Sequence, residues 1–175
     1  MQVFSIAKLN LLFSFALLAT SIASGTAMKA QTLSENSAAS DNKAVVLRAE
    51  AELWSKGKLA MADQMYSPDF VCHFILGREW RGLEGIRGAV QSHRTSFPDW
   101  NERVDDIIAE GDRVAIRITS TGTQLGDFEG LKPTGKKITI QEFHIFRLSG
   151  GKIVEQWGMP DVQGLMAQLS APGQK

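Results

Sequence analysis

Apolar positions follow a helical period in the first part of the domain. After Asp41, they recur three or four apart among charged residues, which predicts an amphipathic helix ending near Gly57. A short second helix is predicted over 59–65 and a third over 83–96, with a strand over 70–76 between them. The apolar positions of the first helix are Val45, Val46, Ala49, Leu53 and Trp54.

After Pro98 the apolar period changes to two, which predicts strands. Gly150-Gly151 predicts a tight hairpin turn before the last strand, and a short helix is expected from Asp161 to Leu169. Helices followed by a run of strands indicate the α+β class. A curved antiparallel sheet wrapped around three N-terminal helices would form a cone with one internal apolar pocket. The predicted strands cover 100–109, 113–124, 137–148 and 152–157.

The N-terminus has the pattern of a secretory signal. Lys8 is the only charge before the apolar run Leu9–Ala23, and small residues follow at Gly25-Thr26-Ala27. The run is shorter than a spanning helix needs, so we expect cleavage, no stable membrane anchoring, and a periplasmic or extracellular location. The predicted organisation is a signal peptide at 1–30, a disordered leader at 31–41, the domain at 42–170 and a tail at 171–175.

Composition excludes some classes of protein. Lys+Arg and Asp+Glu both number 19, and this zero net charge argues against a nucleic-acid or anionic-membrane partner. Cys72 is the single cysteine, so no internal disulfide can form. The three histidines, His73, His93 and His144, lack any zinc-motif spacing, and no phosphate-loop or serine-nucleophile motif occurs. We therefore expect neither a metal nor a cofactor.

The last hairpin predicts which side chains share a face. With Gly150-Gly151 as the turn, Leu148 would face Ile153, Phe146 would face Glu155 and His144 would face Trp157. A one-residue shift in the turn would change these partners. A mixed apolar and titratable face is typical of a ligand pocket. The apolar positions of the other face, Phe143, Ile145 and Val154, predict a homodimer. The expected pocket face holds Glu142, His144, Phe146, Leu148, Ile153, Glu155 and Trp157.

A series of short segments, in this order and spacing, resembles the SnoaL-like polyketide cyclase (ester cyclase) family of the nuclear-transport-factor-2-like superfamily. The resemblance extends from about Val45 to Leu169 and implies the superfamily's conical α+β fold. Because this fold hosts isomerases, dehydratases, hydrolases, cyclases and binders, it implies the function less strongly. The segments are 97–100 (FPDW), 109–114 (AEGDRV), 121–123 (TGT), 133–136 (PTGK), 145–147 (IFR), 151–157 (GKIVEQW), Asp161 and 168–169 (QL).

Three residues are the candidates for catalysis. Glu142 and His144 project the same way from one strand, and a carboxylate beside an imidazole can move protons. The resemblance implies that an aspartate after the sheet acts as general acid/base, and Asp161 stands at that position. Asp161 is equally well placed to cap the last helix. Glu142 and Glu155 could instead be solvated, or paired with Arg117 or Arg147 on the sheet.

Other residues are candidates for the pocket lining. His73 shares its strand face with apolar residues, although a core or rim role is the usual one for such a histidine. Glu155 is the further carboxylate that could face the pocket. The full expected lining is His73, Phe74, Trp80, His93, Phe146, Glu155 and Trp157.

Three functions fit these features. The first is a cofactor-free lyase or isomerase of a small apolar carbonyl compound, using His144, Asp161 and Glu142. The second is an epoxide-type hydrolase in which Asp161 or Glu155 activates water. The third is a non-catalytic pocket for a small molecule. Carboxylates with perturbed pKa values inside the cavity favour catalysis, whereas carboxylates that cap helices or face solvent favour binding alone.

Overall fold

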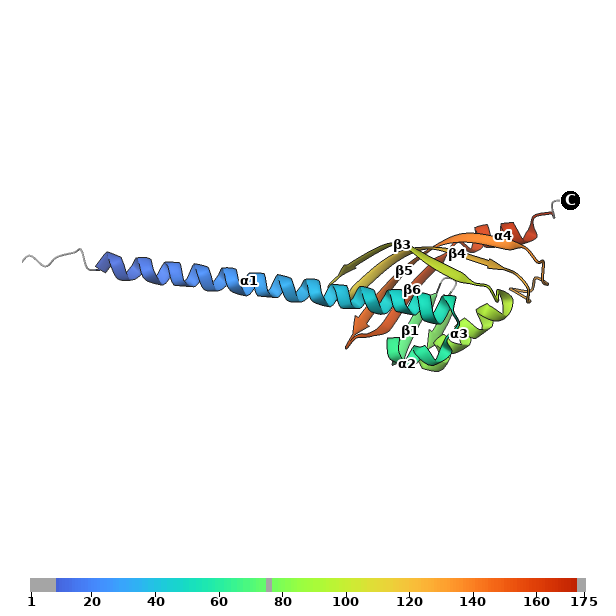
Figure 1. The fold of residues 1–175 in the computed structure, drawn as a ribbon, viewed down its shortest axis with the longest axis horizontal. Helices are drawn as coiled ribbons and strands as arrows, with labels where there is room; N and C mark the ends of the chain where they lie inside the picture. The colour runs from blue at the N-terminus through green and yellow to red at the C-terminus, as the bar shows by residue number, and fades with distance from the viewer. Residues whose placement is uncertain (1–8, 75–76, 173–175) are drawn as a thin grey trace, which may run out of the picture. The chain divides into compact units, whose positions relative to one another are not determined.

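The structure is a computed structural model that describes residues 9–74 and 77–172, with side chains from residue 28 onward (Figure 1). The helices are α1 (Leu9–Arg48), the π-helix η2 (Ala49–Ser55), the 3₁₀ turn η3 (Leu59–Met61), α2 (Ala62–Met65), α3 (Gly82–Ser96) and α4 (Val162–Ser170). The strands are β1 (Tyr66–Phe74), β2 (Glu79–Arg81), β3 (Asn101–Glu110), β4 (Arg113–Thr123), β5 (Lys137–Ser149) and β6 (Lys152–Pro160).

The N-terminal segment differs from the expectation of a disordered leader. Residues 1–38 form one compact unit and residues 39–175 a second, and residues 31–41 are helical within α1. No Gly or Pro occurs between residues 26 and 56, so no residue of this stretch breaks the helix. Residues 1–8 of the predicted signal lie outside the described part, as do residues 173–175 of the predicted tail. In the part of the chain that the structure describes, no helix is both long and apolar enough to cross a membrane.

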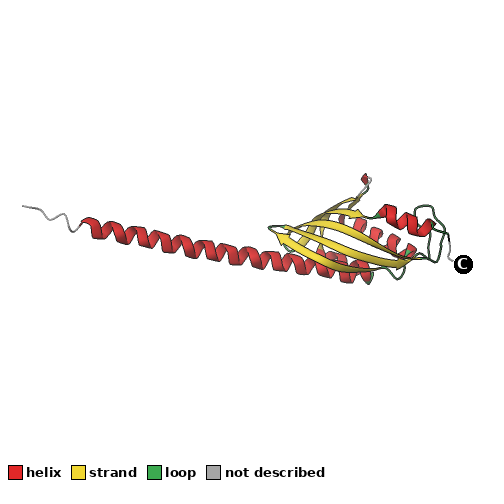
Figure 2. Cartoon of the chain, turned by 90° about the horizontal axis from the view of Figure 1, so that it is seen from above, coloured by secondary structure: helices red, strands yellow, loops and turns green. Residues whose placement is uncertain are grey.

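A single six-stranded sheet organises the second unit. Its order is β2-β1-β6-β5-β4-β3, which confirms the predicted α+β class, and Figure 2 shows its long strands as one curved layer. Helix α3 packs on β1, and η2 packs on β3. The sheet is antiparallel except that β1 pairs with β6 in parallel, because the chain returns to β1 only after α3 and the meander β3–β6.

Strands β4 and β5 alternate regularly between buried and more exposed residues. In β5, residues 138, 140, 142, 144, 146 and 148 are buried, and β4 alternates in the same way. Period-two burial is the sheet pattern that the sequence predicted. The inner face of the sheet and the helices enclose the main core, which contains the buried Val46, Leu53, Ile86, Ile116 and Phe146.

The register of the β5–β6 hairpin is only partly as predicted. Leu148 faces Ile153, as expected, but a bulge then shifts the pairing by one residue. Arg147 therefore faces Glu155, and His144 faces Gly158. The predicted pairs of Phe146 with Glu155 and of His144 with Trp157 are wrong. Because side chains alternate between faces, one extra residue moves every later side chain of β6 to the opposite face.

Candidate functional site

A cavity of about 680 Å³ lies between α3, η2 and the inner face of the sheet. This volume is within the usual range for sites that enclose a small molecule. Most of its wall is apolar, with a small number of polar groups from β3, β5 and β6. The apolar wall includes Trp54, Phe74, Trp80, Trp100, Phe128, Ile140, Leu165 and Met166, and the inner polar groups are His93, Glu102, Glu142, His144 and Gln156.

His93 belongs to an aromatic wall of the cavity. Its ring packs edge-on against Trp100, with the ring centroids 4.2 Å apart, and is stacked on Phe97 at 5.2 Å. Burial lowers the pKa of His93 to about 4, so its ring is neutral near pH 7. We infer that His93 shapes the cavity as an aromatic side chain and carries no charge there.

Glu142 and His144 lie side by side on β5. Nε2 of His144 lies 3.4 Å from Oε2 of Glu142, and Ser120 Oγ donates to Oε1 of Glu142. Burial of Glu142 acts to raise its pKa, but the interactions with His144 and Ser120 outweigh it, and the pKa is lowered. The Glu142–His144 pair therefore places an ionised carboxylate beside an imidazole in a largely dry cavity.

Gln156 holds the far side of the imidazole. Its Nε2 lies 3.2 Å from Nδ1 of His144, and its Oε1 has no hydrogen-bond partner among the described residues. If Gln156 donates to Nδ1, the ring proton of neutral His144 lies on Nε2, toward Glu142. If the amide is rotated by half a turn, Oε1 of Gln156 accepts a hydrogen bond from a protonated Nδ1. Gln156 can therefore form a hydrogen bond with Nδ1 in either protonation state of His144. Gly158 faces His144, and a Cβ there would lie only 2.9 Å from the Phe74 ring.

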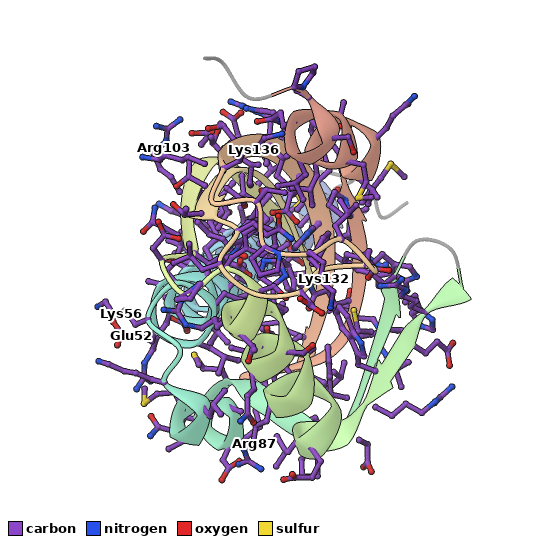
Figure 3. All side chains as sticks on the ribbon, turned by 90° about the vertical axis from the view of Figure 1, so that its right-hand side faces the viewer. Glu52, Lys56, Arg87, Arg103, Lys132 and Lys136 are labelled. Atoms are coloured by element: carbon purple, nitrogen blue, oxygen red, sulfur yellow. The ribbon has the colours of Figure 1, made fainter. Side chains whose placement is uncertain are left out.

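A second carboxyl pair combines Glu102, which lines the cavity, with Glu50, which does not. Glu50 of η2 is only 1% exposed, and Glu102 of β3 accepts a hydrogen bond from Trp100 Nε1 at 2.8 Å. Burial raises the pKa of Glu50 to about 7 and that of Glu102 well above its ordinary value, to which the charge of the neighbouring Glu50 contributes. The adjacent Glu52 points outward to Lys56 instead (Figure 3). The site thus combines two carboxyl groups with raised pKa values, Glu50 and Glu102, and one with a lowered pKa, Glu142. Carboxyl groups whose pKa values are shifted apart are common in acid/base enzymes.

Arg94 fixes the two tryptophans that flank this pair. Its guanidinium donates to the carbonyl oxygens of Trp54, Ser55 and Trp100, at 3.1, 2.7 and 3.1 Å. These bonds satisfy carbonyl groups at the end of η2, which a helix terminus leaves unpaired. Arg94 therefore ties the π-helix to the start of β3, next to the cavity.

The structure brings five of the predicted site residues to the cavity. Phe74, Trp80, His93, Glu142 and His144 all line it, as the sequence indicated. Phe146 is buried on the same sheet face but lies in the core cluster instead of the cavity wall.

Three other predicted pocket residues lie on the outer face of the sheet. His73 stacks on Trp157, with the ring centroids 5.4 Å apart, and Glu155 lies 2.9 Å from Nε2 of His73. Glu155 also accepts from Arg147 at 2.8 Å, the alternative partner foreseen for it. The prediction that these three side chains enter the pocket is wrong. The bulge moves Glu155 and Trp157 to the outer face, and His73 alternates on β1 with Phe74, which lines the cavity.

Asp161 caps α4 and does not line the cavity. Its Oδ1 accepts a hydrogen bond from the backbone nitrogen of Gly164 at 2.8 Å, and the side chain is exposed. This is the geometry of an N-cap, which was one of the two interpretations of its position.

The cap predicts how Asp161 variants behave. We expect Asp161→Ala to lower the free energy of unfolding by about 1 kcal/mol, because the Gly164 nitrogen loses its acceptor, whereas Asp161→Asn should be nearly neutral. Urea denaturation of both variants measures this. If Asp161→Asn and Asp161→Ala lose the same free energy of unfolding, the capping role is contradicted.

The sequence interpretation missed Glu50, Glu102, Ser120 and Gln156. Signals for two of them were present. Glu50 follows Val46 by four residues and precedes Leu53 by three, so it shares their buried helix face. Glu102 lies two residues after Trp100 in the predicted strand, so the two side chains point to the same face. Gln156 could not be found without knowledge of the bulge.

Among the described residues, no group of three or more His, Cys, Asp or Glu side chains is placed to hold a metal ion.

Comparisons with known proteins agree with this geometry. The sequence profile of the SnoaL-like polyketide cyclases matches residues 44–169, and the chain belongs to that family. Among solved structures, it is similar to a proposed SnoaL-like polyketide cyclase from Jannaschia sp. CCS1, with 26% identity and a TM-score of 0.72, over 77% of this chain and 94% of that one. It is also similar to AclR, a proposed hydroxylase from Streptomyces galilaeus, with 30% identity and a TM-score of 0.67, over 78% and 86% of the two chains.

Curated relatives point to the same family. The chain is 28% identical to the aklanonic acid methyl ester cyclase DnrD of Streptomyces peucetius over 96 residues, which are 54% of this chain and 66% of that one. It is 25% identical to the nogalonic acid methyl ester cyclase of Streptomyces nogalater over 122 residues, 68% of this chain and 90% of that one. The match to DnrD covers less than two thirds of its length. A proposed hydroxylase among the structural neighbours shows that the family alone does not define the reaction.

Proposed function

We propose that this protein catalyses proton transfer next to a carbonyl group, without a cofactor, on a small apolar compound held in the cavity. One observation carries the proposal: the Glu142–His144 pair is almost fully buried, lines the cavity and places a carboxylate 3.4 Å from an imidazole. Such a pair can accept a proton from carbon and return it. The sequence similarity to the aklanonic acid and nogalonic acid methyl ester cyclases also supports a carbonyl substrate.

The proposed chemistry begins with a bound ketone or keto ester. The Glu142–His144 pair takes a proton from the carbon next to the carbonyl, the C–H electron pair becomes a C=C bond, and charge moves to the carbonyl oxygen. Returning the proton to a different carbon gives isomerisation. Attack of the new carbon nucleophile on a second carbonyl gives ring closure: the C–C bond forms, the C=O electron pair moves to the second carbonyl oxygen, and the Glu142–His144 pair returns its proton to that oxygen. The aromatic wall favours a flat substrate, because aromatic faces pack well on one another.

The carboxylates favour catalysis over simple binding. Glu50, Glu102 and Glu142 have shifted pKa values at or beside the cavity. Asp161 and Glu155, the two carboxylates considered for an epoxide-type hydrolase, are a helix cap and an outer-face ion pair. Shifted carboxyl groups around one cavity are typical of acid/base sites.

The experiment is deuterium exchange of a ketone. The purified protein is incubated in D₂O with 2-tetralone, and exchange is followed by NMR. The ketone of 2-tetralone lies in a saturated ring fused to a benzene ring and is flanked by acidic C–H groups. An aryl β-keto ester serves as a second probe, with products identified by mass spectrometry. We expect exchange above the buffer rate. Binding of both probes without exchange would support a non-catalytic pocket instead.

We also propose that a second copy of this chain covers the outer sheet face. Phe143 and Met159 are directly opposite each other there and are 57% and 66% exposed, and Ile145 lies next to them. Exposed apolar side chains grouped in this way are typical of an association surface. Light scattering should give a dimer for the mature protein and a monomer for Phe143→Glu. A monomeric wild type at high concentration would contradict this proposal.

We propose, finally, that residues 1–30 direct export. The charge and apolar pattern of the N-terminus supports this. N-terminal sequencing of the protein recovered from a bacterial periplasm or medium should begin near residue 28 or 31. Recovery of the intact chain from the cytoplasm would argue against export.

A further inference from the structure

The Glu142–His144 pair accounts for the base of the proposed reaction but leaves the carbonyl oxygen without a proton donor. Apart from Glu142, the carboxyl residues that line the cavity are Glu84, Glu102, Asp127 and Glu129, and Glu102 is the one of these four that is not exposed. It lies on β3, directly opposite Ser120 of β4, and Ser120 in turn donates to Glu142 of β5. Glu102 and Glu142 therefore occupy the same side of the sheet, separated by one strand.

The hydrogen bonds of Glu102 are incomplete in a way that suits a protonated carboxyl. Trp100 Nε1 donates to its Oε1, while its Oε2 is buried without a partner among the described residues. A buried ionised oxygen without a donor is costly, whereas a carboxylic acid O–H can donate to a ligand oxygen in the cavity. The backbone of Glu102 is held as well, since its nitrogen donates to Ser55 Oγ at 2.9 Å.

Glu50 stands behind Glu102, on the side away from solvent. It is carried by the π-helix η2, a rare helix form that often occurs at functional sites. Neither of its oxygens has a hydrogen-bond partner among the described residues, and its negative charge acts on the Glu102 carboxyl. Two adjacent buried carboxyls cannot both ionise easily, so at least one proton stays on the pair.

We propose that Glu102 is the proton donor to the substrate carbonyl oxygen, and that Glu50 is a positioning residue that keeps the proton on Glu102. The inference rests on the proposed function. As the Glu142–His144 pair removes the proton from carbon, the O–H bond of Glu102 breaks and a new O–H bond forms on the carbonyl oxygen, giving a neutral enol. The Glu102 carboxylate left behind accepts from Trp100 Nε1. The enol returns its proton to Glu102 when the new C–H or C–C bond forms.

The groups that face Glu102 set the pH range of this donor. Burial, the charge of Glu50 on η2 and the charge of Glu142 on β5 all raise the pKa of Glu102, and the Trp100 hydrogen bond lowers it. Glu50→Gln removes one of the raising charges, so Glu102 would lose its proton at lower pH. The activity of this variant should therefore decline at lower pH than that of the wild type.

Two measurements test the inference. In 2-tetralone exchange, Glu102→Gln should lose about 100-fold, because an amide cannot transfer the proton, while the exposed Glu110→Gln at the end of β3 keeps the wild-type rate. In infrared spectra near pH 7, the wild type should show the carbonyl band of a protonated carboxylic acid, and this band should be lost or reduced in Glu102→Gln.

Wild-type exchange rates in Glu102→Gln would overturn the inference while leaving the proposed function intact. A wild type that exchanges neither probe would contradict the proposed function, and the infrared band would then decide the state of Glu102 separately. Absence of a band assigned to Glu102 near pH 7 would overturn the inference whatever the exchange result.

Discussion

Glu50→Gln is expected to stabilise the folded domain by about 3 kcal/mol near pH 8 and to have little effect near pH 4. The folded pKa of Glu50 is about 7, against an ordinary value of 4.5, because burial disfavours its ionised form. A carboxyl whose pKa is raised by folding makes the protein less stable as pH rises from the unfolded pKa to the folded pKa, since the unfolded chain releases its proton first. A shift of this size corresponds to about 3 kcal/mol.

Glutamine removes this penalty because it cannot ionise. It keeps the size of Glu50, and its amide can donate to Glu102. Thermal unfolding followed by circular dichroism at both pH values measures the effect, and the expected rise in Tm near pH 8 is about 10 °C. Glu110→Gln is the matched control, because Glu110 is an exposed glutamate.

A gain in Tm of the same size at both pH values would contradict this account. It would mean that the substitution improves packing and that Glu50 does not titrate in the folded protein. A loss at both pH values would mean that the carboxyl makes a stabilising hydrogen bond that glutamine cannot replace.

Glu142→Gln is expected to slow 2-tetralone exchange by about 100- to 1,000-fold. The variant keeps a hydrogen-bond acceptor for Ser120 and for His144 but removes the charge that lets the Glu142–His144 pair hold the abstracted proton. The exchange rate of His144→Gln should fall by a similar factor. Because the two residues act as one unit, the double variant should be little slower than either single variant.

The stability of these variants separates chemistry from folding. His144 and Ser120 stabilise the ionised form of Glu142 and lower its pKa in the folded protein. The wild type therefore gains free energy of unfolding as pH rises from this lowered pKa to the ordinary one, and Glu142→Gln should lack this gain. Exchange is therefore compared where circular dichroism shows both proteins fully folded. Unchanged exchange in a folded Glu142→Gln would remove Glu142 from the mechanism.

Much of the fold could be predicted from periodicity alone. Helix α3, the long strands β3 to β5 and the start of α4 follow directly from apolar spacing and from turn residues such as Gly150-Gly151. The parallel pairing of β1 with β6 could not be predicted, because the segment over 70–76 carries no signal for its neighbour. Pairing depends on how the whole sheet packs against the helices.

The site was only half predictable, for a specific physical reason. Alternation along β5 placed Glu142 and His144 correctly, since no irregularity interrupts that strand. On β6 the bulge reversed the faces, so Gln156 replaced Glu155 and Trp157 on the cavity side. Glu50 was missed because charged residues are rarely buried, although its spacing matches that of the core residues of the first helix.

The most direct test of the central claim is the rate of deuterium incorporation into 2-tetralone by the wild type and by Glu155→Gln, measured against buffer. Glu155 is the matched control, because it is a hydrogen-bonded carboxylate of the same hairpin that lies on the outer face of the sheet. The account predicts that both proteins exceed the buffer rate equally. A wild type at the buffer rate, or a loss of exchange in Glu155→Gln while Glu142→Gln remains active, would contradict the assignment of catalysis to the cavity.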